Sequence, residues 1–455
     1  MGRMHAGAET GIIPSVRAAG TGQRGSTVLS ARAAIFIALA GVVPGVVLRL
    51  ADIHTGTVSD TALFGLAIVS SAFLLAWAAE ASEMEIAQGL AVAFVALIAV
   101  LPEYAVSMSF AWKAGEDPAY APFAMANMTG ANRLLIGAAW PLIFFLFWLR
   151  NRGRALRLER SYSVEVVALA VATLYSFTLM LKGSVTLIDT AVFGVIFVGY
   201  LSVIMRAPSE EPELVGPARV IGGLRRGPRR AVIAALFLAS AAAILATAEP
   251  FAEGLIHSGT TLGIDEFTLV QWLAPFASEA PEFLVAGILA WRGRAAVAMG
   301  ALLSSKVNQW TLLIGGLPLA YAISGSTLHG LPLDQREIEE LYLTAAQSAF
   351  AVAVLVSLSL AGREALLLLA IFSIQFVLSA VEMPLPFSIM GETVLTASDV
   401  RRVAGTVYLV LAVYVFVKER REIAHLWRSA RKTAKDPSAV HEEDAEFERE
   451  AHAVG

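Results

Sequence analysis

Three glutamates lie beside prolines in stretches of the chain that are otherwise apolar. Glu103 follows Pro102, and Glu279 and Glu282 lie on either side of Pro281. A proline inside a helix cannot donate a backbone hydrogen bond, so it leaves a carbonyl oxygen of the preceding turn without its partner. Carboxylate and carbonyl oxygens are the ligands of hard cations such as Ca²⁺ and Na⁺. If these stretches cross a membrane, the glutamates mark an ion or proton pathway, because an ionised carboxylate there is costly.

The composition indicates that these glutamates do belong to a membrane protein. Of the 455 residues, 57% are hydrophobic and 16% are charged, and the mean hydropathy is +0.67. A soluble globular protein is much less apolar. The apolar residues gather in blocks of about 18 to 30 residues, each long enough to cross a bilayer as a helix. We predict about twelve spans, near 31–50, 62–81, 84–112, 119–149, 162–182, 186–206, 231–250, 263–291, 295–323, 340–361, 364–381 and 401–417.

The arginines alternate between the predicted loops. They gather in the loops after even-numbered spans, and the loops after odd-numbered spans contain few of them. Because positive residues stay on the cytoplasmic side, this pattern predicts a multi-pass protein of a bacterial-type inner (plasma) membrane with both termini in the cytoplasm. Residues 1–30 are expected to form a disordered cytoplasmic tail. Residues 418–455 are expected to form a charged cytoplasmic tail that begins with an interfacial helix.

Two segments of the chain resemble each other. Residues 94–113 read FVALIAVLPEYAVSMSFAWK and residues 273–292 read LAPFASEAPEFLVAGILAWR, so both contain Pro-Glu-aromatic and end in Ala-Trp-basic. Each is followed by a predicted helix that contains Leu-Leu-Ile-Gly. We therefore predict two five-span repeats, 62–206 and 231–381, joined by a cytoplasmic basic loop at 207–230. Since five is odd, the repeats have opposite orientations, as in the inverted repeats of secondary transporters.

The predicted fold is thus an all-α polytopic membrane protein with two inverted five-helix repeats and one flanking helix at each end. The first extra span and its loop occupy 31–61, and the last loop and extra span occupy 382–417. The binding site is expected between the repeats, near the middle of the membrane. Glu279 and Glu282, three residues apart, share one helix face. Solvation explains the acidic residues at predicted span ends, which are Glu80, Glu85, Glu249, Glu253, Asp265 and Glu266.

The repeats resemble those of the cation/calcium antiporter superfamily, which includes the sodium/calcium exchangers. Each repeat of that family has Gly-Thr-Ser-x-Pro-Glu followed by Gly-Asn-x-x-Gly-Ser-Asn. The second repeat is similar to this pattern at 277–282 (ASEAPE) and 300–306 (GALLSSK). The first repeat is similar at 98–103 (IAVLPE) and 126–132 (ANMTGAN).

The resemblance implies that Glu103 and Glu282 jointly bind the transported metal cation, Ca²⁺ or Na⁺. Glu279 is expected to add a third carboxylate from the same helix face as Glu282. The resemblance also implies that polar side chains of the matching segments line the site, and these are Ser278, Ser305, Gln309, Asn127 and Asn132.

Two positive side chains depart from the family pattern and are expected to tune the charge or the coupling of the site. Lys306 stands where the family has an asparagine, and Arg133 directly follows Asn132. Alternatively, Arg133 pairs with Glu279 or with a lipid headgroup, and Lys306 is a plain ion-pair partner. If the ammonium group of Lys306 replaces a bound monovalent cation, the protein exchanges its cation for protons and needs no Na⁺.

The leading hypothesis is a secondary active cation antiporter of the calcium or sodium class, which exchanges its cation for H⁺ or Na⁺ by alternating access. No Walker motif indicates an ATP-driven pump, and neither a His-Glu-x-x-His motif nor a serine with a histidine base indicates an intramembrane enzyme. The expected partners are inorganic cations and the lipid bilayer, with no cofactor, nucleic acid or inferable protein partner. The alternative is a degenerate exchanger-like protein that does not transport and serves as a sensor or scaffold, because Arg133 and Lys306 offset the negative charge.

Overall fold

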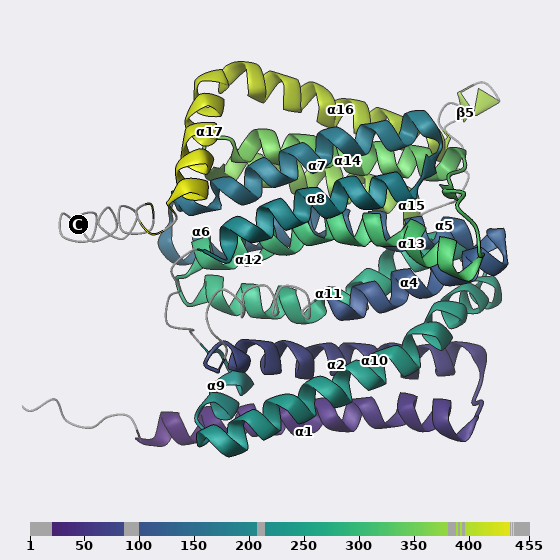
Figure 1. Cartoon of the computed structure of the whole chain (residues 1–455), viewed down its shortest axis with the longest axis vertical. Helices are drawn as coiled ribbons and strands as arrows, with labels where there is room; N and C mark the ends of the chain where they lie inside the picture. Colours follow the sequence, from purple (N-terminus) through teal and green to yellow (C-terminus); the bar gives the residue numbers. More distant parts are fainter. Residues whose placement is uncertain are drawn as a thin grey trace, which may run out of the picture.

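The chain folds almost entirely into helices that run side by side in nearly the same direction (Figure 1). The computed structural model describes residues 21–85, 100–206, 214–380 and 396–436, together with 388–389, 392–393, 438 and 440. The helices are α1 (Thr21–Ala51), α2 (Thr57–Ser82), α4 (Leu101–Glu116), α5 (Ala121–Leu134), α6 (Trp140–Asn151), α7 (Ser163–Lys182), α8 (Leu187–Ile204), α9 (Pro217–Gly222), α10 (Arg226–Leu262), α11 (Glu266–Trp291), α12 (Ala295–Asn308), α13 (Ile314–Ser324), α14 (Gln335–Leu355), α15 (Gly362–Ala380), α16 (Ala397–Lys418) and α17 (Arg420–Lys435).

Short strands join some of the helix ends. They pair in three antiparallel ladders, which are β1 (Ala155–Arg157) with β4 (Ser359–Ala361), β2 (Ser184–Val185) with β3 (Leu331–Pro332), and β5 (Ser388–Ile389) with β6 (Glu392–Thr393). The β1–β4 ladder lies where the sequence predicted the end of a membrane span. The span predicted at 340–361 ends at Leu355, because Leu358 takes a positive φ of 50° and the chain turns into β4. The β1–β4 ladder and the β2–β3 ladder each join a loop of one predicted repeat to a loop of the other, and the two ladders lie at opposite ends of the helices.

Nine helical segments of the described chain are long and apolar enough to cross a membrane. They are 30–51, 57–82, 118–151, 160–182, 187–204, 226–262, 266–291, 335–355 and 397–418. Each overlaps a predicted span. The other three predicted spans contain α4, the α12–α13 segment and α15; residues 86–99 and 381, which belong to two of these spans, lie outside the described residues. A mostly helical fold with helices able to cross a membrane is confirmed, and the arrangement of twelve spans in two inverted repeats stays a prediction.

The ends of several elements differ from the prediction. Helix α1 begins at Thr21, so residues 21–30 are helical, although they were expected to belong to the N-terminal tail. Helix α9 and the first turn of α10 fall within the predicted basic loop at 207–230. Helix α10 also continues through Pro250 to Leu262, twelve residues past the predicted end. Residues 1–20 lie outside the described residues, whereas the predicted C-terminal tail is described as far as Asp436, with α17 at its start, and at 438 and 440.

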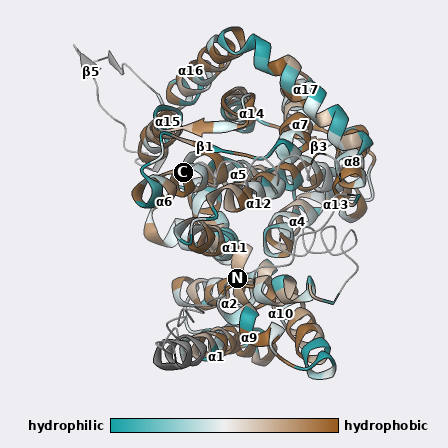
Figure 2. Cartoon of the chain, turned by 90° about the vertical axis from the view of Figure 1, so that its left-hand side faces the viewer, coloured by the Kyte–Doolittle hydropathy of each residue, from teal (hydrophilic) through white to brown (hydrophobic). Residues whose placement is uncertain are grey.

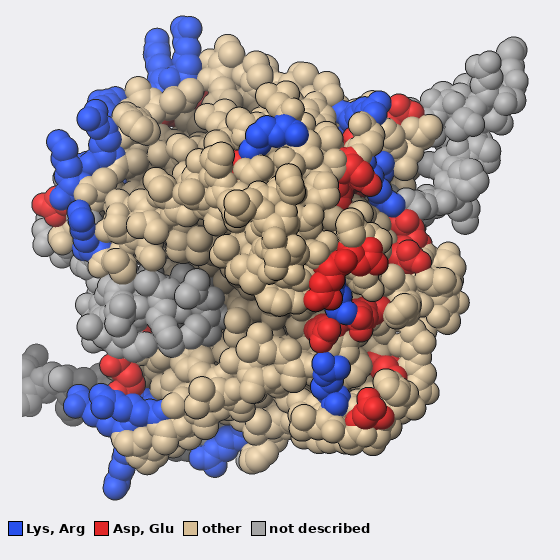
Figure 3. Space-filling view, turned by 45° about the vertical axis from the view of Figure 1, so that its right-hand side comes forward, with Lys and Arg blue, Asp and Glu red and all other residues tan. Residues whose placement is uncertain are grey.

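The exposed surface along the helices is apolar, as expected for a surface that contacts lipid. Hydrophobic residues predominate along the long helices in Figure 2. Leu174, Leu181 and Val195 are 72%, 89% and 73% exposed, respectively. Leaving side chains of this size in water is unfavourable, whereas lipid tails solvate them. Lysines and arginines cluster at one end of the helices and acidic residues at the other (Figure 3).

The helices form two groups that meet at α4 and α11. Helices α1, α2, α9 and α10 pack together at one side of the molecule, and the remaining helices form the larger bundle (Figures 1 and 2). In the larger bundle α5 packs on α11, and α16 packs on α14. The contact between α5 and α11 depends on Gly130, because a Cβ there would lie 1.7 Å from the carbonyl oxygen of Gln271. This is also the carbonyl that Pro275, four residues later, cannot bond.

The third span of each predicted repeat contains a π-helical turn. These turns are η2 (Leu135–Ala139), between α5 and α6, and η4 (Gln309–Leu313), between α12 and α13. Both overlap a Leu-Leu-Ile-Gly sequence, at 134–137 and 312–315. Such turns are rare in helices and are frequent at functional sites. The turn begins one residue after the first leucine of this sequence in the first repeat and three residues before it in the second, and Gln309 belongs to the second turn.

Candidate cation site

Glu103 lies at the contact between the two predicted repeats. Helix α4 begins at Leu101, so Pro102 and Glu103 occupy its first turn, where a proline removes no helical hydrogen bond. The Glu103 side chain is buried, with 2% exposure. Its Oε1 accepts a hydrogen bond from Asn127 Nδ2 at 2.9 Å, and its Oε2 accepts one from Ser278 Oγ at 2.5 Å. Asn127 belongs to α5 and Ser278 to α11, so one carboxylate connects helices of both repeats.

The hydrogen bonds around Asn127 leave one oxygen atom free. Its Nδ2 also donates to Ser107 Oγ at 2.7 Å, which fixes the orientation of the amide. Its Oδ1 is buried and accepts no hydrogen bond from any described residue. A buried acceptor without a partner costs about 1–3 kcal/mol, and a bound cation or water molecule would remove that cost.

Glu279 and Gln309 form a second pair with free oxygens. Gln309 Nε2, on η4, donates to Glu279 Oε1 at 2.9 Å. Glu279 Oε2 and Gln309 Oε1 are buried, and neither has a hydrogen-bond partner within the described part of the chain. Together with Asn127 Oδ1, the site therefore contains three oxygen acceptors that no donor of the described residues satisfies. This is the chemistry of a hard-cation site, because such ions take carboxylate and amide oxygens as ligands.

The three glutamates lie close enough to interact through their charges. Glu103 interacts with Glu282, and Glu279 interacts with both of them. Glu282 is only half-buried, and the Ser305 side chain lies beside its carboxylate. No three His, Asp or Glu side chains of the described residues come together tightly enough to form a metal cluster. A cation at this site would therefore need neutral oxygens such as Asn127 Oδ1 and Gln309 Oε1 as well as carboxylates.

Lys306, on a helix of the second repeat, also contacts a residue of the first repeat. Its side chain is fully buried on α12, and Nζ donates to Asn132 Oδ1 at 2.6 Å and to the Asn132 carbonyl at 3.4 Å. It also lies 4.3 Å from the centre of the Trp310 ring. Glu279 is the carboxylate that attracts it, but no acidic group of the described chain comes within the 4 Å of an ion pair. The idea that Lys306 is a plain ion-pair partner is therefore wrong, because its direct partner is Asn132.

Arg133 does not belong to the carboxylate cluster. Its Nη2 lies 2.6 Å from Glu340 Oε2 on α14, and its Nη1 donates to Gln375 Oε1 on α15 at 2.9 Å. The guanidinium group also lies 4.9 Å from the centre of the Trp272 ring. Pairing with Glu279 or with a headgroup was the expected alternative, and both are wrong because Glu340 neutralises Arg133 inside the protein. The cluster therefore contains three carboxylates and one nearby cation, Lys306.

Several polar residues of this region were not predicted from the sequence. Glu340 was placed at the start of a predicted span, but α14 begins at Gln335, so Glu340 is 1% exposed. Ser107 lies one turn after Glu103 on α4, and this helical spacing was the available signal. Tyr104 donates to Asn308 Oδ1 at 2.8 Å, which adds another contact between the repeats. Ile98 and Ala99 of the first motif lie outside the described residues.

Comparisons with known proteins identify the family of the chain. A family model described as sodium/calcium exchanger protein matches residues 58–206 and 232–381. A solved structure of the H⁺/Ca²⁺ exchanger CAX is 38% identical in sequence and superposes with a TM-score of 0.82, over 89% of this chain and 99% of that one. A structure of native YfkE is 17% identical, with a TM-score of 0.58 over 76% of this chain and 99% of that one, which shows a shared fold. No curated protein sequence matches the chain. Because the family model matches both halves and more than half of the residues, the chain belongs to the sodium/calcium exchanger protein family.

Proposed function

We propose that this protein is a secondary active antiporter that exchanges Ca²⁺ for H⁺ at the site around Glu103, Glu279 and Glu282. The observation that carries the proposal is the bond from Ser278 Oγ to Glu103 Oε2, which joins the two repeats at a buried carboxylate. Inverted-repeat transporters bind their ions at such a contact. The similarity to an H⁺/Ca²⁺ exchanger over nearly the whole chain supports this choice of ions.

The polar contacts between the repeats suggest how the site alternates. Ser278 with Glu103, Lys306 with Asn132 and Tyr104 with Asn308 each join a helix of one repeat to a helix of the other. Rocking of one repeat against the other would have to break or exchange these hydrogen bonds. The first two connect buried groups and the third is half-buried, so breaking them is costly unless an ion or a proton takes their place. Movement would thus depend on an occupied site, which is the requirement for exchange rather than leakage.

Charge balance gives a reason for proton exchange. A Ca²⁺ ion requires ionised carboxylates, and when the ion leaves, the buried negative charges must be neutralised. Protons can neutralise Glu103, Glu279 and Glu282, and a protonated carboxyl group can also donate a hydrogen bond. In this proposal Lys306 keeps its positive charge, because its ammonium group donates to Asn132 Oδ1 and to the Asn132 carbonyl and lies over the Trp310 ring. The site therefore needs two protons or one divalent cation, and it has no need of Na⁺.

The orientation follows from the distribution of charge. The end of the molecule with the loops around Arg157, Arg160, Arg229 and Arg230 would face the cytoplasm of a bacterial-type cell, by the positive-inside rule. Both described ends of the chain, at α1 and α17, lie at this end in Figure 1. The acidic end would face the opposite side, where Glu249 and Glu253 surround Lys113.

Changing Lys306 to asparagine is expected to make exchange depend on Na⁺ or to weaken its coupling to protons. The substitution removes the buried positive charge near Glu279 and replaces it with an amide. A monovalent cation could then occupy the space, as oxygen ligands would remain around it. The measurement is Ca²⁺ flux in sealed vesicles at fixed pH gradient with and without Na⁺.

Lys113→Asn, at the acidic end of α4, is the matched control and should leave the ion requirement unchanged. Exchange by Lys306→Asn with the wild-type proton coupling and no response to Na⁺ would contradict this role.

A non-transporting sensor or scaffold remains the competing function, because Lys306 lies in the cluster. The two functions differ in one result. An antiporter moves Ca²⁺ against its gradient when a pH gradient is supplied, and a sensor binds ions without moving them.

A further inference from the structure

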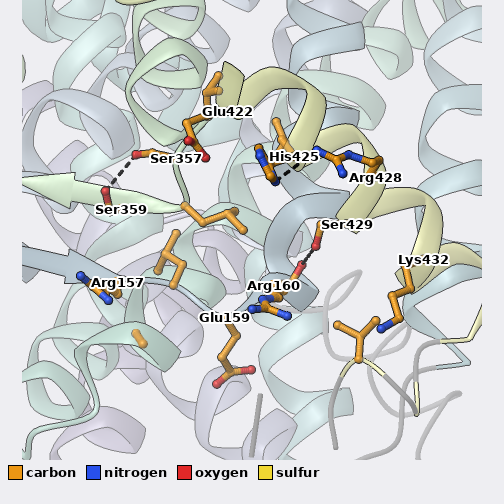
Figure 4. Close-up of a pocket in the computed structure, with 16 residues that line it drawn as sticks. Arg157, Glu159, Arg160, Ser357, Ser359, Glu422, His425, Arg428, Ser429 and Lys432 are labelled. Atoms are coloured by element: carbon orange, nitrogen blue, oxygen red, sulfur yellow. Dashed lines mark hydrogen bonds between the residues drawn. The ribbon is translucent and has the colours of Figure 1, made fainter. Parts of the chain in front are cut away.

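A large cavity opens at the arginine-rich end of the molecule, far along the helices from the acidic end. It has a volume of about 720 Å³ and lies between α17, the segment 157–160 before α7, and the turn 356–359 after α14 (Figure 4). Pockets that bind small molecules have volumes of roughly 300–1,000 Å³. The carboxylate cluster is not part of its lining.

The polar lining of this cavity is predominantly positive. Four basic side chains line it, namely Arg157, Arg160, Arg428 and Lys432, against two acidic ones, Glu159 and Glu422. Figure 4 shows that the basic groups come from two elements, the segment before α7 and helix α17. Arginine binds phosphate through two parallel hydrogen bonds, and lysine adds a mobile positive charge. The lining is therefore suited to a phosphate group.

The two basic elements are held together by a direct contact. Ser429 Oγ donates to the carbonyl oxygen of Arg160 at 3.3 Å, so α17 is connected to the start of α7. On α17, Arg428 Nη2 lies 3.3 Å from His425 Nδ1, and Arg428 Nε donates to the Ala424 carbonyl at 3.1 Å. The helix therefore holds Arg428 at the edge of the cavity. No acidic side chain of the described residues forms an ion pair with Arg428, so its charge is available.

Helix α17 lies at the level where lipid headgroups are expected. It runs across the ends of the long helices rather than alongside them (Figure 1). Leu426, Ala430 and Thr433 are buried against the protein at helical spacing, whereas Ile423 and Trp427 are 40% and 52% exposed. Tryptophan is enriched at the headgroup level of membranes, and a helix with basic and apolar faces lies in the interface.

We propose that this cavity binds the phosphate-bearing headgroup of an anionic phospholipid. The position beside Trp427 at the end of the membrane helices favours a lipid over a soluble phosphate, because the acyl chains of a lipid would extend along the exposed apolar helices. Leu158, Val356 and Leu358 supply an apolar floor for the glycerol region. Ala296, at the start of α12, also lines the cavity. A bound lipid would thus contact the helix that carries Ser305 and Lys306. This proposal does not depend on which ions are transported.

The test compares two double variants of α17 that remove the same charge. Arg428→Gln with Lys432→Gln removes basic groups that line the cavity. Arg431→Gln with Lys435→Gln removes two exposed basic groups of the same helix that do not line it. Binding of phosphatidylglycerol to the purified full chain is titrated by native mass spectrometry, with phosphatidylcholine as the neutral lipid. The first pair is expected to weaken phosphatidylglycerol binding by about 10- to 30-fold, and the second pair by much less.

Two outcomes would overturn the proposal. One is equal loss of phosphatidylglycerol binding in both double variants, which would indicate attraction to a charged surface rather than a site. The other is binding of soluble glycerol 3-phosphate that depends on Arg428 and Lys432 while phosphatidylglycerol binding does not, which would make the occupant a soluble phosphate. Circular dichroism of each variant checks that α17 and the remaining helices are retained.

Discussion

Replacing Glu103 by glutamine is expected to abolish cation exchange, with flux reduced to the level of empty vesicles. Glutamine keeps the size of the side chain, and its oxygen can still accept from Asn127 or Ser278. It cannot carry the negative charge that a divalent cation requires or take up the exchanged proton. Glu282→Gln should have the same effect, because it also removes a titratable carboxylate from the cluster while membrane insertion is retained.

Glu116→Gln provides the matched control for this result. Glu116 is the last residue of α4, the helix that begins two residues before Glu103, and it is exposed. The same chemical change at the other end of the same helix should leave flux close to wild type. If Glu103→Gln and Glu116→Gln transport equally well, Glu103 does not bind the transported ion.

The second large effect is expected on stability, at the buried pair of Arg133 and Glu340. Glu340→Gln would leave the buried Arg133 guanidinium with neutral partners alone among the described residues, namely the new amide, Gln375, the Thr129 carbonyl and the face of Trp272. Removing one member of a buried ion pair costs about 3–5 kcal/mol. Arg133→Met should cost less, because Glu340 keeps Arg401 at 3.8 Å. Denaturant titration in mixed micelles measures the free energy of unfolding of each variant and so gives both losses of stability.

A double variant and a surface control complete this test. Arg133→Met combined with Glu340→Gln removes both charges, so its loss of stability should be smaller than the sum of the single losses. Arg402 pairs with Glu339 at 2.6 Å, but its side chain is 54% exposed, so Arg402→Met should cost about 1 kcal/mol or less. Additive losses at Arg133 and Glu340 would show that the two residues do not stabilise the fold as a pair.

The sequence predicts the membrane fold well because the apolar blocks have the length that a bilayer requires. The Pro-Glu segments also identify the side chains that meet, since internal similarity and helical spacing are local properties of the chain. Glu103 and Ser278 are in contact as the repeats suggest, although they are 175 residues apart. The sequence predicts that these two segments meet only because both carry the same Pro-Glu motif.

The partners of the two basic residues could not be predicted in this way. Arg133 meets Glu340 on a helix outside either motif, and Lys306 meets Asn132 rather than a carboxylate. Counting charges along the chain places both cations in the cluster, whereas the structure shows that Arg133 is neutralised elsewhere. The end of the predicted span at 361 was wrong for a related reason. The turn at Leu358 is stabilised by the pairing of β4 with β1, a contact between distant segments.

Ca²⁺ uptake by reconstituted vesicles tests the central claim most directly. The purified protein is placed in Na⁺-free liposomes with an acidic interior, and Ca²⁺ inside is followed with a fluorescent indicator after Ca²⁺ is added outside. The account predicts that Ca²⁺ accumulates against its gradient and that uptake stops when a proton ionophore collapses the pH gradient or when Glu103 is replaced by glutamine. No uptake by the wild-type protein under a pH gradient, or uptake that requires Na⁺, would contradict it.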